Sequence, residues 1–142
     1  VLAGRRINEG MGGWGAQYLL RAMIARDSRI KDAPVLILGV TFKEDVSDLR
    51  NTRVIDVVAE LESYGMRVEV HDPMADLEVA QKQLGISLVT PVPGRYAAVI
   101  LAVPHMVLRT AGVMAIRQYL SHNGVIVDLK GVLPRGSDVL RI

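Results

Sequence analysis

Residues 34–39 read PVLILG, which places four branched aliphatic side chains between a proline and a glycine. A short, continuously apolar run of this kind is typical of a strand that is buried on both faces of a parallel sheet. We therefore expect a buried strand at residues 35–38, which the glycine ends.

Beyond this strand, the chain alternates between short apolar runs and segments with helical periodicity. Further strands are predicted at residues 67–70, 86–89, 97–103 and 125–129, and helices at residues 52–64, 77–84 and 106–121. Strands that alternate with helices indicate βαβ units, and right-handed crossovers place the helices on both faces of one sheet. The prediction is an α/β fold: a Rossmann-like, doubly wound parallel sheet of about five strands, in the order 3-2-1-4-5.

The segment before the first strand shows a helical pattern of its own. Spacings of three and four mark one apolar face: Ile7, Met11, Trp14, Tyr18, Leu19, Ala22 and Met23. The chain begins at Val1 with this helix already under way, so we expect it to come from a longer protein. We expect residues 1–26 to pack against another chain or to be partly disordered, with Trp14, Tyr18 and Met23 in the core of that interface. We expect residues 1–30 and residues 31–142 to belong to two different domains.

The composition excludes several classes of protein. Half of the residues are apolar, which is enough for one domain to bury a core. The net charge of +2 is too small for a nucleic-acid footprint, and the basic residues alternate with acidic ones. The lack of cysteine excludes a disulfide scaffold and a thiolate zinc site. No membrane-spanning run or signal peptide is evident, so we expect a cytoplasmic protein without a membrane partner.

The predicted topology also indicates where a ligand binds. In a doubly wound sheet, ligands lie beyond the carboxyl ends of the strands, where the winding reverses. Here that point lies between the first strand and the strand at residues 97–103, which directs attention to Phe42, Lys43, Arg50 and His105. The first loop lacks the G-x-G-x-x-G pattern, and this argues against ordinary NAD binding by this domain alone.

Two basic residues in this loop favour an anionic ligand. Lys43 offers a point charge suited to a phosphate, and Arg50 offers a planar fork just before a predicted helix. Surface salt bridges to Asp45 and Asp48 are the alternative. Lys130 follows the strand at residues 125–129 on the same edge, which makes it a candidate second contact.

The remaining polar candidates have simpler explanations. Asp72 ends a strand where a Rossmann domain often holds a ribose hydroxyl, but an Asp-Pro turn with Pro73 explains it equally well. For His105, a turn residue is favoured over a catalytic one. The histidines show no metal-ligand spacing, so no metal site is expected: His71, His105 and His122.

Residues 39–51, GVTFKEDVSDLRN, carry a more specific signal. They resemble the G-x-x-F-K-x-x-x-x-D-x-R segment of the nucleotide-sugar 6-dehydrogenases, which include the UDP-glucose, GDP-mannose and UDP-N-acetylhexosamine dehydrogenases. The resemblance continues through Asp72-Pro73 and residues 97–105 and 127–131, so it spans nearly the whole chain. Residues 5–8 resemble the end of the long helix in the family's central dimerisation domain.

This resemblance implies a function for the chain. Members of the family have an NAD-binding Rossmann domain, a central helical domain and a C-terminal domain that holds the nucleotide sugar. They oxidise the sugar C6 alcohol to a carboxylate in two NAD-dependent steps, through a Cys-linked intermediate. The chain resembles the third domain and the tail of the second. Phe42 and Lys43, and less directly Lys130, then contact the substrate, and Arg50 reaches NAD on the first domain.

The resemblance also implies partners and a substrate class. We expect a UDP-sugar ligand, NAD bound mainly by the first domain, and a homodimer formed through the central domain. Residues 51–53 and 128–133 look most like members acting on UDP-N-acetylhexosamines, for surface polysaccharide biosynthesis. Because the chain lacks cysteine and a glycine-rich dinucleotide loop, we expect it to be inactive alone.

Two other functions compete with this interpretation. One is a stand-alone nucleotide-binding module that regulates a partner, and the other is an oligomerisation domain without a ligand. The valine at position 1 and the truncated helix argue against the first alternative. The basic loop from Phe42 to Arg50, at the point where the winding reverses, argues against the second.

Overall fold

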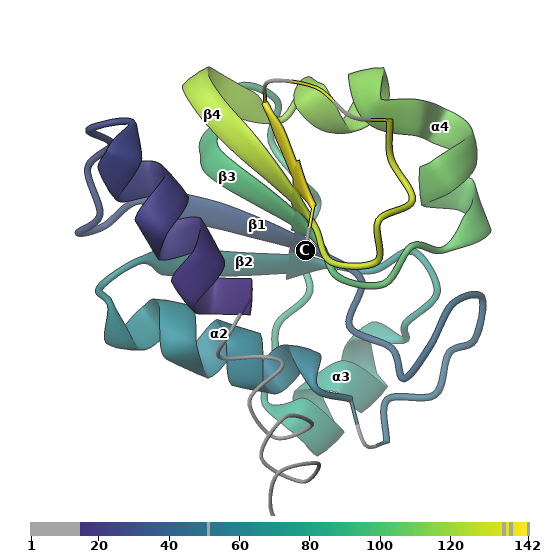
Figure 1. The fold of residues 1–142 in the computed structure, drawn as a ribbon. Coiled ribbons are helices and arrows are strands. Elements are labelled where there is room, and N and C mark those ends of the chain that lie inside the picture. The colour runs from purple at the N-terminus through teal and green to yellow at the C-terminus, as the bar shows by residue number, and fades with distance from the viewer. Residues whose placement is uncertain (1–14, 51, 135, 137, 142) are drawn as a thin grey trace, which may run out of the picture.

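A parallel sheet organises the chain, shown in a computed structural model that describes residues 15–50, 52–134, 136 and 138–141. Its strand order is β2-β1-β3-β4-β5, and all neighbouring strands are parallel. The strands are β1 (Pro34–Leu38), β2 (Arg67–His71), β3 (Tyr96–Leu101), β4 (Leu120–Asp128) and β5 (Val139–Arg141). The predicted α/β, Rossmann-like sheet is confirmed (Figure 1).

Helices cover both faces of this sheet. They are a helix at residues 15–25, α2 (Val54–Ser63), α3 (Leu77–Leu84) and α4 (Met106–Arg117). The helix at residues 15–25 and α2 contribute buried side chains to one core cluster, whereas α4 contributes to the other. Figure 1 shows α4 on the far side of the sheet from α2.

The alternation of side chains along β1 explains its continuous apolar run. Val35 and Ile37 belong to the first core cluster, and Leu36 and Leu38 to the second. All four side chains are at most 1% exposed. Because both faces of the strand are covered, neither set of alternate positions tolerates a polar residue.

The helix at residues 15–25 corrects one expectation. Leu19 and Met23 are 0% and 1% exposed, and they pack into the core beneath this chain's own sheet. The interpretation of Met23 as part of an interface with another chain is therefore wrong. The physical reason is that this face of the sheet needs a cover beside α2, and the helix supplies it. Ile7, Met11 and Trp14 lie outside the described residues.

The helix boundaries follow local capping signals where these exist. The prediction for α3 is confirmed at both ends, because Asp76 accepts a hydrogen bond from the Val79 amide and Gly85 ends the helix at φ +67°. The predicted helix at residues 52–64 is shorter, at Val54–Ser63. The helix predicted at residues 106–121 ends at Arg117.

The observed strands differ from the predicted strands in three places. Residues 86–89 form only a bridge between Leu88 and Val70, because the segment is a few residues long and prolines follow it. The fifth strand of the sheet is instead β5, which the sequence analysis did not predict. The strand predicted at residues 125–129 begins earlier, at Leu120, and includes Asn123 at φ +65°.

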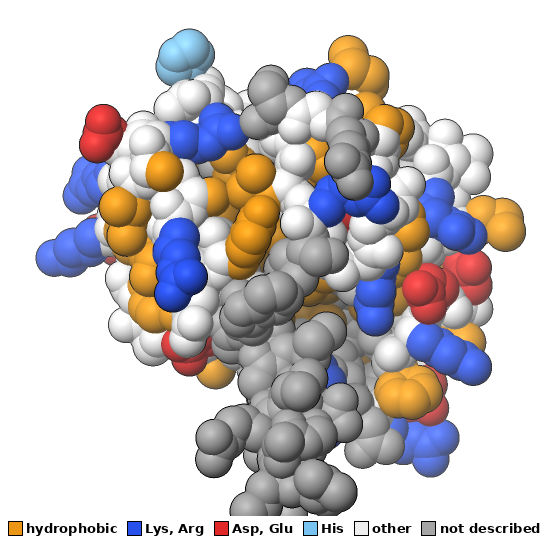
Figure 2. Space-filling view, viewed as in Figure 1, with side chains coloured by type: hydrophobic (Ala, Val, Ile, Leu, Met, Phe, Trp, Pro, Cys, Tyr) orange, Lys and Arg blue, Asp and Glu red, His pale blue; other side chains and the backbone are white. Residues whose placement is uncertain are grey.

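The surface agrees with the mixed charge pattern of the sequence. Figure 2 shows Lys and Arg side chains dispersed over the visible face, with Asp and Glu side chains among them. Among the described residues, no helix is long and apolar enough to cross a bilayer.

Candidate functional site

The residues singled out from the sequence lie at one edge of the sheet. Phe42, Lys43 and Arg50 follow the carboxyl end of β1, and Lys130 follows that of β4 (Figure 1). All four side chains are exposed, so they are available to a ligand. His105 follows β3 at the same edge but is fully buried.

The loop after β1 leaves the sheet through a glycine for a steric reason. Gly39 has φ +97°, and a Cβ atom added to it would lie 2.5 Å from the Cβ of Val103. Any other residue would meet both the left-handed penalty and this overlap. Gly39 therefore allows the loop after β1 to pass against the end of β3, at the point where the winding reverses.

A buried carboxylate lies beneath this loop. Asp72 Oδ2 accepts hydrogen bonds from the amides of Val40 (2.7 Å) and Thr41 (3.2 Å), and Oδ1 accepts one from Met74 (2.7 Å). Burial alone would raise the pKa of the Asp72 carboxyl, but hydrogen bonds from His105 and from the amides of Val40 and Met74 outweigh it and lower that pKa below its ordinary value. Asp72 is therefore an internal anion at neutral pH.

These contacts decide between the two interpretations of Asp72. Its side chain is 0% exposed, so no ribose reaches it, and the structural interpretation holds. The first loop of a dinucleotide-binding domain directs its backbone amides at the pyrophosphate. Here Asp72 occupies the amides of Val40 and Thr41. The loop therefore does not fit a dinucleotide, in agreement with its lack of the glycine pattern.

His105 joins this carboxylate to the middle of the loop. Its Nδ1 accepts a hydrogen bond from the Asp45 amide at 2.8 Å. Its Nε2 lies 3.0 Å from Asp72 Oδ2 and 3.2 Å from Thr41 Oγ1. Because an amide only donates, Nδ1 carries no proton, and the hydrogen-bond pattern assigns the proton of a neutral ring to Nε2. His105 is buried and contacts the chain's own groups, which is a structural role.

Asp45 completes the network from the opposite side. It has φ +60°, and its Oδ1 accepts a hydrogen bond from the amide of Met106 at 2.7 Å. Met106 is the first residue of α4, so the carboxylate caps that helix. The sequence analysis missed this role because Asp45 and Met106 lie 61 positions apart and no local pattern links them.

The two basic residues of the loop differ in their partners. Arg50 contacts Asp48 through two side-chain hydrogen bonds, of 3.1 and 3.0 Å, and its side chain is 79% exposed. These hydrogen bonds lower the pKa of the Asp48 carboxyl. The salt-bridge alternative is thus observed for Arg50 in this structure. Within the part of the chain that the structure describes, Lys43 has no ion-pair partner.

The turn that carries Lys130 is also fixed from below. Asp128 is fully buried at the end of β4, and its carboxylate accepts hydrogen bonds from the amides of Gly131 (2.9 Å) and Leu133 (2.7 Å). Lys130 itself is exposed between these anchored residues. It is therefore a second cation on a supported loop at the same edge.

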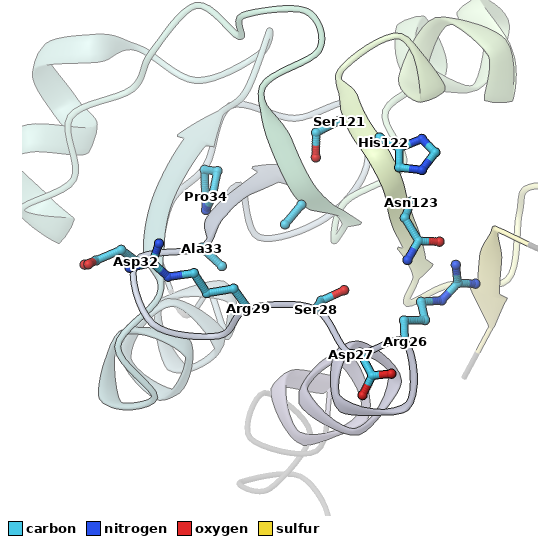
Figure 3. A pocket seen from close by; sticks show the side chains of 11 residues that line it. Arg26, Asp27, Ser28, Arg29, Asp32, Ala33, Pro34, Ser121, His122 and Asn123 are labelled. Carbon is cyan, nitrogen blue, oxygen red and sulfur yellow. The ribbon is translucent and has the colours of Figure 1, made fainter.

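A hollow of about 390 Å³ lies at the opposite, amino-terminal edge of the sheet (Figure 3). Ala33, Pro34 and Ala97 are among its lining residues. Two arginines and two aspartates also line it: Arg26, Arg29, Asp27 and Asp32. Their charges balance, so the hollow favours no charge class of ligand.

The exposed side chains at the carboxyl edge suit the binding of an anion. The sequence has no cysteine, and among the described residues no three His, Asp or Glu side chains group as metal ligands. The exposed groups are instead the ammonium of Lys43, the ring of Phe42 and the ammonium of Lys130. This combination fits a phosphorylated ligand.

Comparisons with known proteins agree with this assignment. Residues 36–135 match the family described as "UDP-glucose/GDP-mannose dehydrogenase family, UDP binding domain". The chain is 42% identical over its full length to a UDP-N-acetyl-D-glucosamine 6-dehydrogenase of Pseudomonas aeruginosa, and 41% identical to one of Salmonella typhi. It spans 34% of the length of each of these relatives.

Solved structures show the same fold. An NDP-N-acetyl-D-galactosaminuronic acid dehydrogenase from Methanosarcina mazei superposes with a TM-score of 0.82, at 19% identity, over 99% of this chain and 30% of that one. A UDP-D-ManNAc dehydrogenase from Pyrococcus horikoshii superposes with a TM-score of 0.79, at 21% identity, over 97% of this chain and 32% of that one.

Proposed function

Because this chain belongs to the UDP-glucose/GDP-mannose dehydrogenase family, as its UDP binding domain, we propose that it holds the nucleotide sugar in an NAD-dependent nucleotide-sugar 6-dehydrogenase. The full protein would oxidise the sugar C6 alcohol to a uronic acid, in the cytoplasm, for surface polysaccharide biosynthesis. A UDP-N-acetylhexosamine is the proposed substrate, since two relatives above 40% identity are named for such a sugar.

One observation carries the proposal for this chain. Lys43 is an exposed cation without an ion-pair partner among the described residues, at the edge where α/β sheets bind ligands. Its loop is held by buried hydrogen bonds on Asp72 and His105. An ammonium without an ion-pair partner, carried on an anchored backbone, is suited to the diphosphate of a UDP-sugar.

Phe42 and Lys130 are the other proposed substrate contacts. Phe42 is 53% exposed directly beside Lys43, so the backbone and ring at this position can approach the ligand. Lys130 lies on the anchored loop after β4, at the same edge. Together they would hold the nucleotide from two loops that different strands position.

NAD would be bound mainly by another domain of the full protein. The loop after β1 does not fit a dinucleotide, because Asp72 already occupies its amides. Arg50 is exposed at the same edge and is the residue we propose to reach NAD across the domain boundary. It would exchange its contact with Asp48 for that anion.

We propose that residues 1–30 are the end of a central dimerisation-domain helix and that residues 31–142 form the UDP-sugar domain. The helix at residues 15–25 leads into Pro34 and also covers the sheet. This arrangement would couple the position of the sheet to the central domain. A homodimer would form through that central domain.

Calorimetric titration of this chain with UDP tests the site. Lys43→Ala removes a charge-assisted hydrogen bond, worth about 1.5–3 kcal/mol, so UDP affinity should fall about 10- to 100-fold. Lys31→Ala makes the same change at the amino-terminal edge and should leave the affinity unchanged. Equal affinities for Lys43→Ala and the unsubstituted chain would exclude the proposed site.

The chain alone should not reduce NAD with any nucleotide sugar. It has no cysteine to form a covalent intermediate and no loop that positions a nicotinamide. NADH formation by the pure chain, followed by absorbance with UDP-sugars and NAD, would contradict the assignment of catalysis to other domains.

A further inference from the structure

A few hydrogen bonds fix the backbone of the loop that carries Lys43. The Phe42 amide donates a hydrogen bond to the Asp48 carbonyl at 2.6 Å, which closes the segment between them. Just before this segment, Thr41 Oγ1 donates to the carbonyl of Lys43 within it at 2.9 Å. The backbone at Lys43 is therefore set by a hydroxyl, not only by its neighbours in sequence.

That hydroxyl is itself held by His105. Thr41 Oγ1 uses its proton for Lys43, so it can only accept from His105 Nε2. The single Nε2 proton is shared between Thr41 Oγ1 at 3.2 Å and the nearer Asp72 Oδ2 at 3.0 Å. The second ring nitrogen, Nδ1, accepts from the Asp45 amide two positions beyond Lys43. A single ring thus contacts the loop on both sides of the lysine.

The ring cannot shift without breaking these contacts. His105 and Asp72 are both 0% exposed, and Asp72 Oδ2 fixes the ring through the bond at 3.0 Å. Asp72 is fixed in turn by the amides of Val40 and Met74. The chain of contacts runs from the end of β2, through the ring, to the backbone around Lys43.

We propose that His105 is a positioning residue for the nucleotide-binding loop: through Thr41 and Asp45 it sets the backbone that aims Lys43 at the diphosphate. This inference rests on the proposed function of Lys43. His105 does not touch the ligand. Its contacts hold the backbone at Lys43, and the ammonium reaches the ligand from that backbone.

Two isosteric variants separate the two ring nitrogens. His105→Asn places an acceptor near Nδ1, so the Asp45 contact is kept and the contacts with Asp72 and Thr41 are lost. His105→Gln places a donor near Nε2, so the Asp72 contact is kept and the Asp45 contact is lost. We expect His105→Gln to weaken UDP binding about 2- to 10-fold, as for one lost hydrogen bond. His105→Asn should also weaken UDP binding, because it loses the contacts of Nε2 with Thr41 and Asp72.

The coupling to Lys43 distinguishes positioning from a general loss of structure. In the Lys43→Ala background, His105→Gln should cause no further loss of UDP affinity, because the group it positions is absent. Thermal unfolding of each variant, followed in parallel, reports the structural cost. His122→Gln is the matched control, since His122 is exposed at the opposite edge, and it should leave UDP affinity unchanged.

A variant of Thr41, the residue that His105 contacts, tests the same inference if the His105 variants unfold. Thr41→Val retains the shape of the side chain but removes the hydroxyl that holds the Lys43 carbonyl. It should weaken UDP binding by a similar factor, again only while Lys43 is present.

The outcomes separate this inference from the proposed function. Unchanged UDP affinity in both His105→Gln and Thr41→Val would overturn the inference, and so would equal losses with and without Lys43. An unchanged affinity for Lys43→Ala would overturn the proposed site, and the positioning role with it. A loss for Lys43→Ala, with none for the other variants, would overturn the positioning role alone.

Discussion

The two edges of the sheet present charged side chains in different ways. At the carboxyl edge, Lys43 and Lys130 lie on loops held by buried carboxylates, those of Asp72 and Asp128. At the amino-terminal edge, the arginines and aspartates of the hollow balance one another. The comparison shows that exposed charge alone does not make a site. A site needs an excess of one charge and a rigid support beneath it.

Removal of the buried support should have the largest effect. Asp72→Ala leaves the amides of Val40, Thr41 and Met74 without their acceptor in a buried environment. We expect the free energy of unfolding to fall by about 3–5 kcal/mol, measured by urea denaturation. Asp32→Asn at the opposite edge keeps a residue that tolerates φ +62°, removes only an exposed ion pair with Arg67 and should cost about 0–1 kcal/mol. Similar costs at both edges would refute the contrast.

Two glycines with positive φ sharpen the comparison. Gly39→Ala meets Val103 at 2.5 Å as well as the left-handed penalty, so we expect a loss of about 2–4 kcal/mol in the free energy of unfolding. Gly94 precedes β3 at φ +73°, with nothing within 4 Å of an added Cβ. Gly94→Ala should therefore cost about 1 kcal/mol, the backbone penalty alone. A smaller loss for Gly39→Ala would show that the loop yields easily.

Acid should weaken the carboxyl edge through Asp72. The pKa of Asp72 is lower in the folded chain than in the unfolded chain, where it is about 3.9. Its stabilising contribution is therefore complete above about pH 4 and is lost as the pH falls through the folded-state pKa. Urea denaturation between pH 7 and pH 3 should show a smaller acid-dependent loss for Asp72→Asn than for the unsubstituted chain. Equal losses would mean that other carboxylates account for it.

The smallest effect is expected for Arg50. It lies near Lys43 in sequence and carries the same charge, but it is highly exposed and contacts Asp48. Arg50→Ala should change UDP affinity by less than about 2-fold and leave the free energy of unfolding nearly unchanged, because the ion pair with Asp48 is exposed to solvent. A loss equal to that of Lys43→Ala, in the same calorimetric titration, would mean that the loop attracts anions without a specific contact.

Much of the fold could be predicted from local signals. The predicted bounds of α3 agree with the structure, where the cap at Asp76 and the left-handed Gly85 both act within one helical turn. Elements at the sides of the sheet were predicted less well. Residues 86–89 and β5 each pair with only one neighbouring strand and at few positions. Whether they pair depends on which backbone groups of that neighbouring strand remain unpaired. Short edge strands carry little periodicity from which to predict them.

The position of the site could be predicted from the sequence, but the hydrogen bonds that support it could not. Topology placed Lys43, Arg50 and His105 near one edge, because the carboxyl ends of parallel strands meet there. Neither the contact of Asp45 with His105 nor its cap on α4 had any signal in the sequence. These hydrogen bonds join residues about 60 positions apart, and no spacing rule reaches so far along a chain.

The sequence by itself determined the layers of this protein and the charge it presents. Continuous apolar runs require a sheet covered on both faces, and the side-chain types decide which loop is cationic. Only the tertiary structure decided which charges remain available and which are buried. Arg50 is drawn to Asp48, whereas Lys43 is left without an ion-pair partner among the described residues. Asp72 becomes an internal anion because folding brings the ends of β1, β2 and β3 within hydrogen-bond distance of one carboxylate.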